Sequence, residues 1–178
     1  SLIKNFPRAT VKINDLSVIN LAPFEGDTLF YSQNLELKMS VKELFKKEGE
    51  AMEVKSIVAD NALVQILFNK DGIGNYDIAI KKEEEKSEAT TSFFQMKIQD
   101  YAIKNSRFVF NNAQSNMRME LFDIQHQGKG DFTAKQLDLE TKTTTNLSFN
   151  MNGTSFASRL PLALDAVIGM DVENQKYT

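Results

Sequence analysis

The sequence contains no cysteine and no tryptophan, and it has one histidine and three prolines among its 178 residues. Without cysteine the chain can form neither a disulfide nor a thiolate metal site, and the redox compartment stays open. No apolar run approaches the roughly 18 residues of a membrane-spanning helix, and no signal peptide is visible. Because the chain starts at Ser1 and stops at Thr178, just after what reads as the start of another strand, we expect it to be a segment of a longer protein.

Charged residues are balanced and interleaved along the chain. Lysine and arginine total 21 against 24 acidic residues, which gives a net charge of −3. Phosphate backbones bind to clustered basic surfaces, yet the only lysine pairs, Lys46-Lys47 and Lys81-Lys82, are each followed by acidic residues. The sequence therefore predicts no nucleic-acid partner.

Patterns that would indicate catalysis or metal binding are missing. His126 is the only histidine, no Gly-x-Ser-x-Gly elbow is present, and the alternation of His126 with Ile124 and Phe122 is typical of a strand. The segment Asn69-Lys70-Asp71 begins like a calcium loop, but Ile73 occupies a ligand position, so we interpret it as a turn. The sequence predicts no enzyme, no cofactor and no metal site.

Alternation of apolar and polar residues with a period of two dominates the chain, as in strands with one covered face. Leu35 to Val41 and Met117 to Leu121 show it clearly, and Pro161 lies where an edge strand or a bulge would tolerate it. The threonine-rich run 141–145 is compatible with strand and is expected to contain a turn. These patterns predict an all-β fold.

One segment breaks the period of two. Ser40-Val41-Lys42-Glu43 has the spacing of a capping box, and Gly49 is a possible stop, so we expect a short helix over residues 41–47, laid over one end of the sheet. Turn chemistry predicts hairpin tips at Gly128-Lys129-Gly130-Asp131 and at Asn152-Gly153. The expected fold is a curved, mainly antiparallel sheet of repeated amphipathic strands with one or two short helices, forming an open groove or half-barrel.

A charged and polar stretch divides the chain. Residues 81–92 have nothing to bury and predict a solvated linker between a first β-unit, 1–80, and a second, 93–178, which is truncated at its C-terminal end.

The two halves resemble each other. Met52–Asn61 is similar to Met96–Asn105 at a spacing of 44, and Val11–Asn20 is a looser copy. Each copy reads as a strand, a polar kink and an Asn before the next strand. A repeat of this length indicates stacked β-units that cover one another's apolar faces, with coincidence among amphipathic strands as the alternative.

The order of these segments resembles the AsmA family. Phe6–Val18 is similar to the opening of its periplasmic domain, and Leu35–Phe45 and Met52–Val58 follow as they do in that family. Asp71–Tyr76 resembles the family's Asp-Gly-x-x-Asn-aromatic signature, and Met96–Phe110 resembles its second block. The resemblance covers about residues 6–150. The membrane anchor expected before residue 1 and most of the long C-terminal body are absent.

The resemblance implies a periplasmic cell-envelope protein, anchored in the inner membrane and related to the TamB-type repeating β-groove lipid transporters. Such a module binds or conducts phospholipid or another acyl lipid, contacts neighbouring repeats of the full-length protein, and supports outer-membrane assembly or integrity. It has no catalytic residues to transfer. The alternative is a structural or interaction β-domain with a closed core that docks onto neighbouring repeats or an outer-membrane assembly partner.

The apolar strand face is the candidate binding site, because it is rich in Phe, Leu and in Met, whose unbranched, polarisable side chain adapts to acyl chains. The alternative is that the same side chains pack against each other as a closed core. The predicted lipid-facing residues are Leu35, Leu37, Met39, Val64, Ile66, Phe108, Phe110, Met117, Met119, Leu147, Phe149 and Met151.

Overall fold

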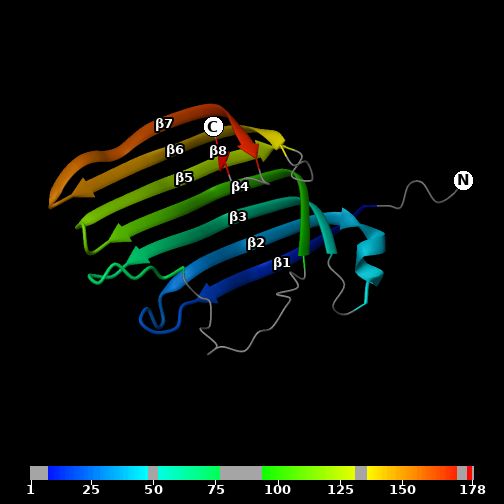
Figure 1. Cartoon of the computed structure of the whole chain (residues 1–178), viewed down its shortest axis with the longest axis horizontal. Coiled ribbons are helices and arrows are strands. Elements are labelled where there is room, and N and C mark those ends of the chain that lie inside the picture. The colour runs from blue at the N-terminus through cyan, green and yellow to red at the C-terminus, as the bar shows by residue number, and fades with distance from the viewer. Residues whose placement is uncertain (1–7, 48–51, 77–93, 131–135, 172–175, 178) are drawn as a thin grey trace, which may run out of the picture.

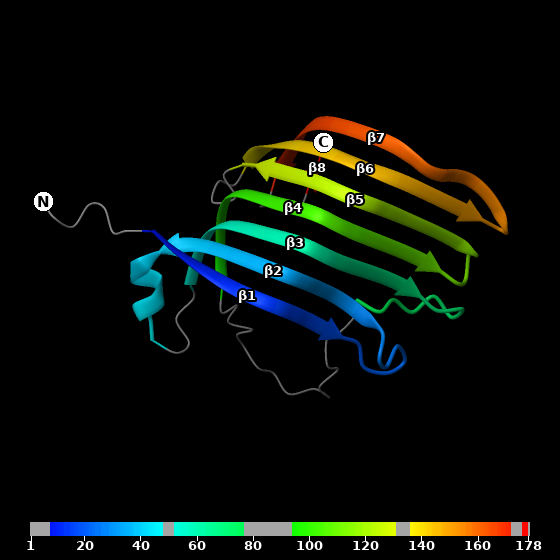
Figure 2. The ribbon, with the colours of Figure 1, turned by 180° about the vertical axis from the view of Figure 1, so that it is seen from behind.

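The computed structural model describes residues 8–47, 52–76, 94–130, 136–171 and 176–177, and the strands in these ranges form one sheet. Figures 1 and 2 show the strands side by side from the two sides of the molecule. Their bounds are β1 Arg8–Ile19, β2 Thr28–Ser40, β3 Met52–Phe68, β4 Phe94–Asn112, β5 Met117–Lys129, β6 Gln136–Met151, β7 Thr154–Asp171 and β8 Lys176–Tyr177.

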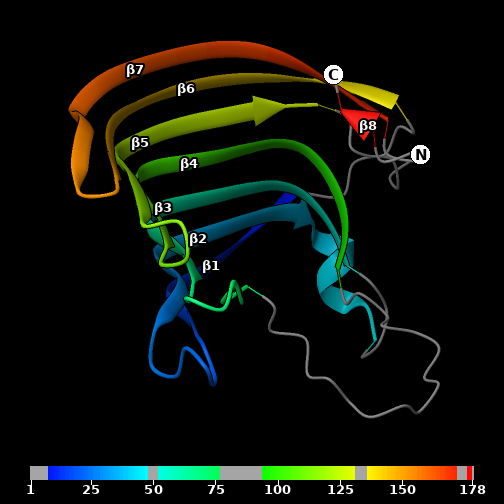
Figure 3. The ribbon, with the colours of Figure 1, turned by 60° about the vertical axis from the view of Figure 1, so that its left-hand side comes forward.

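The strands lie in the sheet in the order of the sequence, from β1 to β8. Every neighbouring pair is antiparallel except β3 and β4, which run parallel. The sheet is strongly curved and open, without closing into a barrel (Figure 3). The prediction of an all-β, mainly antiparallel, curved open sheet is confirmed.

The parallel pair explains the similarity between the two halves of the chain. Ser56 pairs with Asp100 and Asp60 with Lys104, so positions 44 apart in the sequence lie side by side. The two similar segments are thus neighbouring strands, and their pairing joins the predicted units 1–80 and 93–178 in one sheet. The predicted linker, 81–92, lies outside the described residues.

Five of the strands bend at a residue in the left-handed region, which Asn and Asp tolerate better than most side chains. These residues are Asp15 in β1, Asn61 in β3, Asn105 in β4, Asp123 in β5 and Arg159 in β7, with φ between 48° and 54°. The prediction that Asn61 and Asn105 precede the next strand is wrong, because each strand continues through its bend.

At each bend the alternation of the strand slips by one residue. Ala59 and Ala62 are both buried although they lie three residues apart, whereas Asp60 and Asn61 between them point to the other side. Apolar residues before and after the bend therefore share one face, which a strict period of two would not allow.

Burial distinguishes the inside of the bend from the outside. Ser32 pairs with Ala62, and the N–H of Ala62 donates to the hydroxyl of Ser106 at 3.0 Å. These three small residues are at most 6 % exposed, whereas Asn61 and Asn105 are exposed. Side chains are crowded inside a bend and spread apart outside it, so the face of Ser32, Ala62 and Ser106 is the concave face.

Side-chain hydrogen bonds link the bends of neighbouring strands across the convex face. The Nδ2 of Asn61 donates to Oε1 of Gln33 at 3.1 Å, and the Nδ2 of Asn105 donates to Oδ1 of Asp60 at 2.8 Å. The Nε2 of Gln125 then donates to Oδ1 of Asn105 at 2.7 Å. We call these residues, together with the bonded pair Asn146 and Asp123, the polar row.

The predicted helix over 41–47 is a single 3-10 turn, η1, at Val41–Phe45. The capping box does not form, since Ser40 makes no side-chain cap hydrogen bond. Glu43 is instead 1 % exposed, accepts the N–H of Glu53 in β3 at 2.9 Å, and pairs with Lys46 at 2.6 Å. The carboxylate thus ties η1 to the sheet.

Two predicted turns are confirmed. Asn152 and Gly153 join β6 to β7 with φ of 51° and 78°, as a two-residue hairpin requires. The side chain of Asn69 accepts the N–H groups of Asp71 and Ile73, both at 2.9 Å, which closes the turn after β3.

One other predicted turn is wrong, because Thr141–Thr145 lies inside β6. The predicted hairpin tip at 128–131 begins inside β5, which ends at Lys129, and Asp131 lies outside the described residues. Gly128 lies in β5 opposite Tyr101 of β4. A Cβ atom on Gly128 would come within 2.3 Å of the Tyr101 ring. The glycine therefore serves the close approach of an aromatic ring rather than a turn.

Asn105→Val is expected to lower the free energy of unfolding by about 3 kcal/mol, because a β-branched residue disfavours positive φ and two hydrogen bonds are lost. Asn105→Gly loses the same bonds but accepts the backbone conformation, so its loss should be about 1 kcal/mol. Urea unfolding followed by circular dichroism measures both variants. Equal losses would show that the left-handed bend does not constrain this position.

Candidate functional site

The concave face gathers the predicted lipid-facing residues into rows that cross the sheet. On one side of the bends, cross-strand pairing forms two rows of four side chains. The first row is Val64, Phe108, Leu121 and Leu147, and the second is Ile66, Phe110, Met119 and Phe149. Met117 pairs with Met151 beyond them. We call these residues the apolar arm.

On the other side of the bends lie the remaining predicted residues. Leu35 pairs with Ala59 and with Ile13, and Leu37 pairs with Ile57. Met39, at the end near η1, is 2 % exposed and is the one predicted residue that is fully buried. The structure thus places all the predicted residues on one curved face, in two groups separated by the bends.

The apolar arm is not a closed core. Its side chains are half-buried, and Met151 is 38 % exposed. The buried apolar residues of the described chain lie elsewhere or are small, as Ala59, Ala62 and Val109 are. Among the described elements, η1 is the one that lies outside the sheet, and it contacts β2 and β3. Large apolar side chains are therefore available to a ligand.

A polar group interrupts the concave face across β4, β5 and β6. The hydroxyl of Tyr101 lies 2.9 Å from Nε2 of His126, and Nδ1 of His126 lies 2.7 Å from Oγ1 of Thr143. Burial lowers the pKa of His126 and raises the pKa of Tyr101, so both are neutral at pH 7. His126 is thus held between two hydroxyl groups.

The bend at Asp123 overturns one expectation for β5. Alternation predicted that Phe122, Ile124 and His126 share a face, but Phe122 lies on the convex face. There its ring lies between the guanidinium groups of Arg107 and Arg159, at 5.1 and 4.7 Å from the ring centroid. No sequence pattern indicates this arrangement, because the slip occurs at a single residue.

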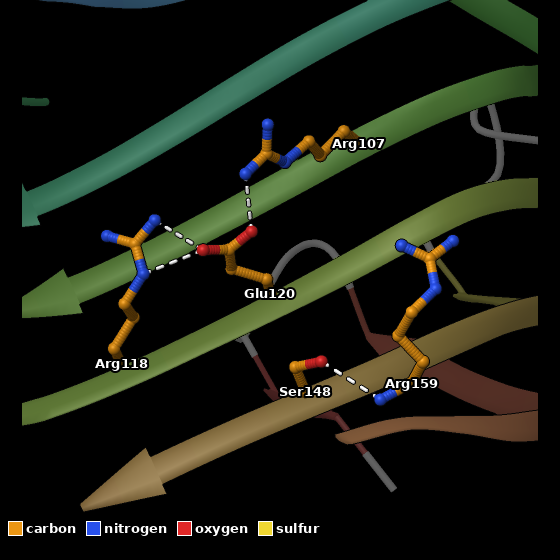
Figure 4. A network of polar contacts seen from close by, with 5 residues as sticks. All are labelled: Arg107, Arg118, Glu120, Ser148 and Arg159. Carbon is orange, nitrogen blue, oxygen red and sulfur yellow. Dashed lines mark hydrogen bonds and ion pairs between the residues drawn. The ribbon is translucent and has the colours of Figure 1, made fainter. Parts of the chain in front are cut away.

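Three charged side chains on the convex face, Arg107, Arg118 and Glu120, contact one another (Figure 4). Glu120, 9 % exposed, accepts from Arg107 at 2.5 Å and from Nε of Arg118 at 2.7 Å. Burial alone raises the pKa of Glu120, but the two arginines outweigh it and hold the pKa below its ordinary value. The N–H of Arg159 donates to Ser148 at 3.0 Å. Glu120 is thus held as a carboxylate by two arginines, and the buried Val109 lies opposite it in β4.

Asn75, in the segment Asp71–Tyr76 after β3, has a structural role. Asn75 is 3 % exposed, accepts the N–H of Leu67 at 2.9 Å, and donates to the carbonyl of Gln65 at 2.9 Å. Asn20, in the loop after β1, donates to the carbonyl of Asn75 at 2.6 Å. The two amides thus provide hydrogen-bond partners for backbone groups at the edge of β3, beyond the end of β2. Buried polar groups need such partners.

Other kinds of site have little support in the described residues. No group of three His, Asp or Glu side chains there could hold a metal ion. None of the helical segments described is long and apolar enough to cross a membrane. A cavity of about 600 Å³ spans β4 to β7, but its charged lining mixes Asp100, Glu140 and Asp165 with Lys129 and Lys142 and favours neither sign of ligand.

No family model matches the chain, and comparisons with curated proteins and with solved structures gave no significant match. The proposed function therefore depends on the fold and on the side chains of the concave face.

Glu120→Gln is expected to lower the free energy of unfolding at pH 7 by about 1–3 kcal/mol, since two charge-assisted bonds are weakened. The pKa of Glu120 is lower in the folded than in the unfolded chain, so its contribution is present above the unfolded pKa and is lost as the pH falls through the folded pKa. The difference in the free energy of unfolding between the native chain and the variant should therefore become smaller below about pH 5.

Urea unfolding at several pH values measures this difference. Glu36→Gln is the matched control, because the Glu36–Lys12 pair is exposed and is expected to contribute less than about 1 kcal/mol. If the difference in unfolding free energy for Glu120→Gln stayed constant down to pH 3, this would contradict a lowered pKa of Glu120 in the folded chain.

Proposed function

We propose that this chain is a non-catalytic lipid-binding module whose concave face holds acyl chains. The observation that carries the proposal is the apolar arm: rows of half-buried Phe, Met, Leu, Ile and Val side chains on the inside of an open curved sheet. Exposed apolar patches of this kind mark sites for lipids, ligands or partners.

The shape and chemistry of the arm suit a flexible hydrocarbon chain. Each methylene group that leaves water contributes about 0.8 kcal/mol. The arm contains Met117, Met119 and Met151, whose side chains adjust to irregular partners. Among the described strands, β1 and most of β7 have no neighbour on their outer sides, which leaves room for a chain to lie across the strands. A closed-core structural domain, the alternative, would bury Phe108, Phe110 and Phe149, which are half-buried here.

The resemblance to the AsmA family supplies the proposed setting. In that setting the module faces the periplasm of a bacterial cell, belongs to a protein anchored in the inner membrane, and binds or conducts phospholipid or another acyl lipid. Its biological role would be outer-membrane assembly or integrity, and the module would contact neighbouring repeats of the full-length protein.

Phe110→Lys is expected to weaken binding of a fluorescent fatty acid about 30-fold, because a buried Phe side chain contributes about 2 kcal/mol and a lysine would also place a charge in the groove. Fluorescence titration measures the dissociation constant, and native mass spectrometry of the purified chain tests for bound phospholipid.

Ile73→Lys is the matched control, since Ile73 is 48 % exposed in the turn after β3 and belongs to neither row of the arm. Its affinity should equal that of the native chain. Absence of saturable binding to the native chain, or equal loss in both variants, would overturn the proposal.

A further inference from the structure

The edge strand β7 leaves the concave face incomplete. β7 pairs with β6 along its length, but among the described residues only Met170 and Asp171 pair with β8 on the other side. Leu160, Leu162 and Leu164 are 50, 41 and 61 % exposed at this edge. An edge strand with unpaired backbone groups and exposed apolar side chains is a template for another strand.

The strand at the opposite edge of the same sheet, β1, has the features that a strand paired with β7 needs. In the part of the chain that the structure describes, β1 pairs with β2 alone. Its concave residues include Val11, Ile13 and Leu16, which are half-buried, and it bends at Asp15 as β7 bends at Arg159. Five antiparallel pairings and one parallel pairing separate the two strands, so β1 and β7 run in opposite directions.

We propose that β1 of a second copy of this chain adds antiparallel to β7, so that copies associate head to tail and their concave faces join. Because β1 and β7 already run in opposite directions within one sheet, a copy that is simply shifted along the sheet meets β7 antiparallel with the same face concave. The proposal concerns assembly and holds whether or not lipid occupies the apolar arm.

One register matches the two edges. It places Val11 opposite Leu162 and Ile13 opposite Leu160, so apolar side chains meet on the concave side. On the other side it places Arg8 opposite Asp165, with charges of opposite sign. The positive-φ residues of the two strands then lie within one residue of each other, so both strands bend at the same level.

Two further features fit this register. In this register β1 of the second copy begins at Arg8, opposite Asp165 of β7. Met170 and Asp171 lie beyond this point, so the pairing of β7 with β8 is undisturbed. Pro161, which has no N–H, costs the new ladder one hydrogen bond. A symmetric pairing of β7 with β7 would meet Pro161 twice, and it would lack the match between Arg8 and Asp165.

The absence of native cysteine allows a direct test. Residues directly opposite in an antiparallel pair have Cα atoms about 4.5–5.5 Å apart, which suits a disulfide. The double variant Val11→Cys/Leu162→Cys is expected to give, on mild oxidation, a ladder of dimers, trimers and longer oligomers that reductant reverses. Non-reducing gel electrophoresis measures it, and circular dichroism confirms that the variant is folded.

Matched controls fix the register and the symmetry. Val11→Cys/Val167→Cys has its second cysteine outside the register, at a residue 65 % exposed, and should give no ladder. A dimer from Leu162→Cys alone, as abundant as the ladder, would show symmetric β7 pairing and overturn the proposal. A double variant that stays monomeric, or that cross-links no more than the control, would also overturn it.

Sedimentation of chains without cysteine gives an independent readout. The average mass of the native chain should rise with concentration. Leu162→Lys should remain monomeric, whereas Leu21→Lys, in the loop after β1 at a residue 77 % exposed, should associate like the native chain. A native chain that stays monomeric at every concentration, or equal association of all three, would contradict head-to-tail pairing. Both readouts are independent of fatty-acid binding, so this proposal and the proposed function can fail separately.

Discussion

A sheet that curves along its strands keeps its hydrogen bonds only if neighbouring strands bend at the same level. Here the bends depend on residues such as Asn61 and Asn105, which take positive φ within their strands. Their side chains bond to Gln33, Asp60 and Gln125 on neighbouring strands, so the residues that bend the sheet also connect its strands. Small residues such as Ala62 and Ser106 fill the inside of the bend.

The slip in alternation at each bend links the fold to the proposed function. Without it, apolar residues before and after Asn61 would point to opposite sides, and neither face would be continuous. With it, Leu35 and Leu37 share one concave face with Phe108 and Phe110. The convex face carries the polar row and the arginine–glutamate contacts, together with Phe122 and Val109. The concave face carries the apolar arm and is interrupted by Tyr101, His126 and Thr143.

Simple alternation was enough to predict the strands and the curved open sheet. It failed wherever one residue changed the phase or one distant contact decided the outcome. Phe122 was placed on the wrong face because the bend at Asp123 has no signature of its own. Glu43 looked like part of a capping box, but its carboxylate accepts the backbone N–H of Glu53 in β3. The role of Gly128 became visible only with Tyr101 beside it.

A scan of single cysteines along β5 tests the central claim, one continuous concave face, most directly. Each cysteine would carry a fluorophore, and quenching by a bound brominated fatty acid would be measured. The account predicts quenching at Met119 and Leu121, then at His126, with Asp123 and Gln125 unquenched, because the alternation slips at Asp123. Quenching that continued without a slip through Asp123 and Gln125, or that was equal at all positions, would contradict it.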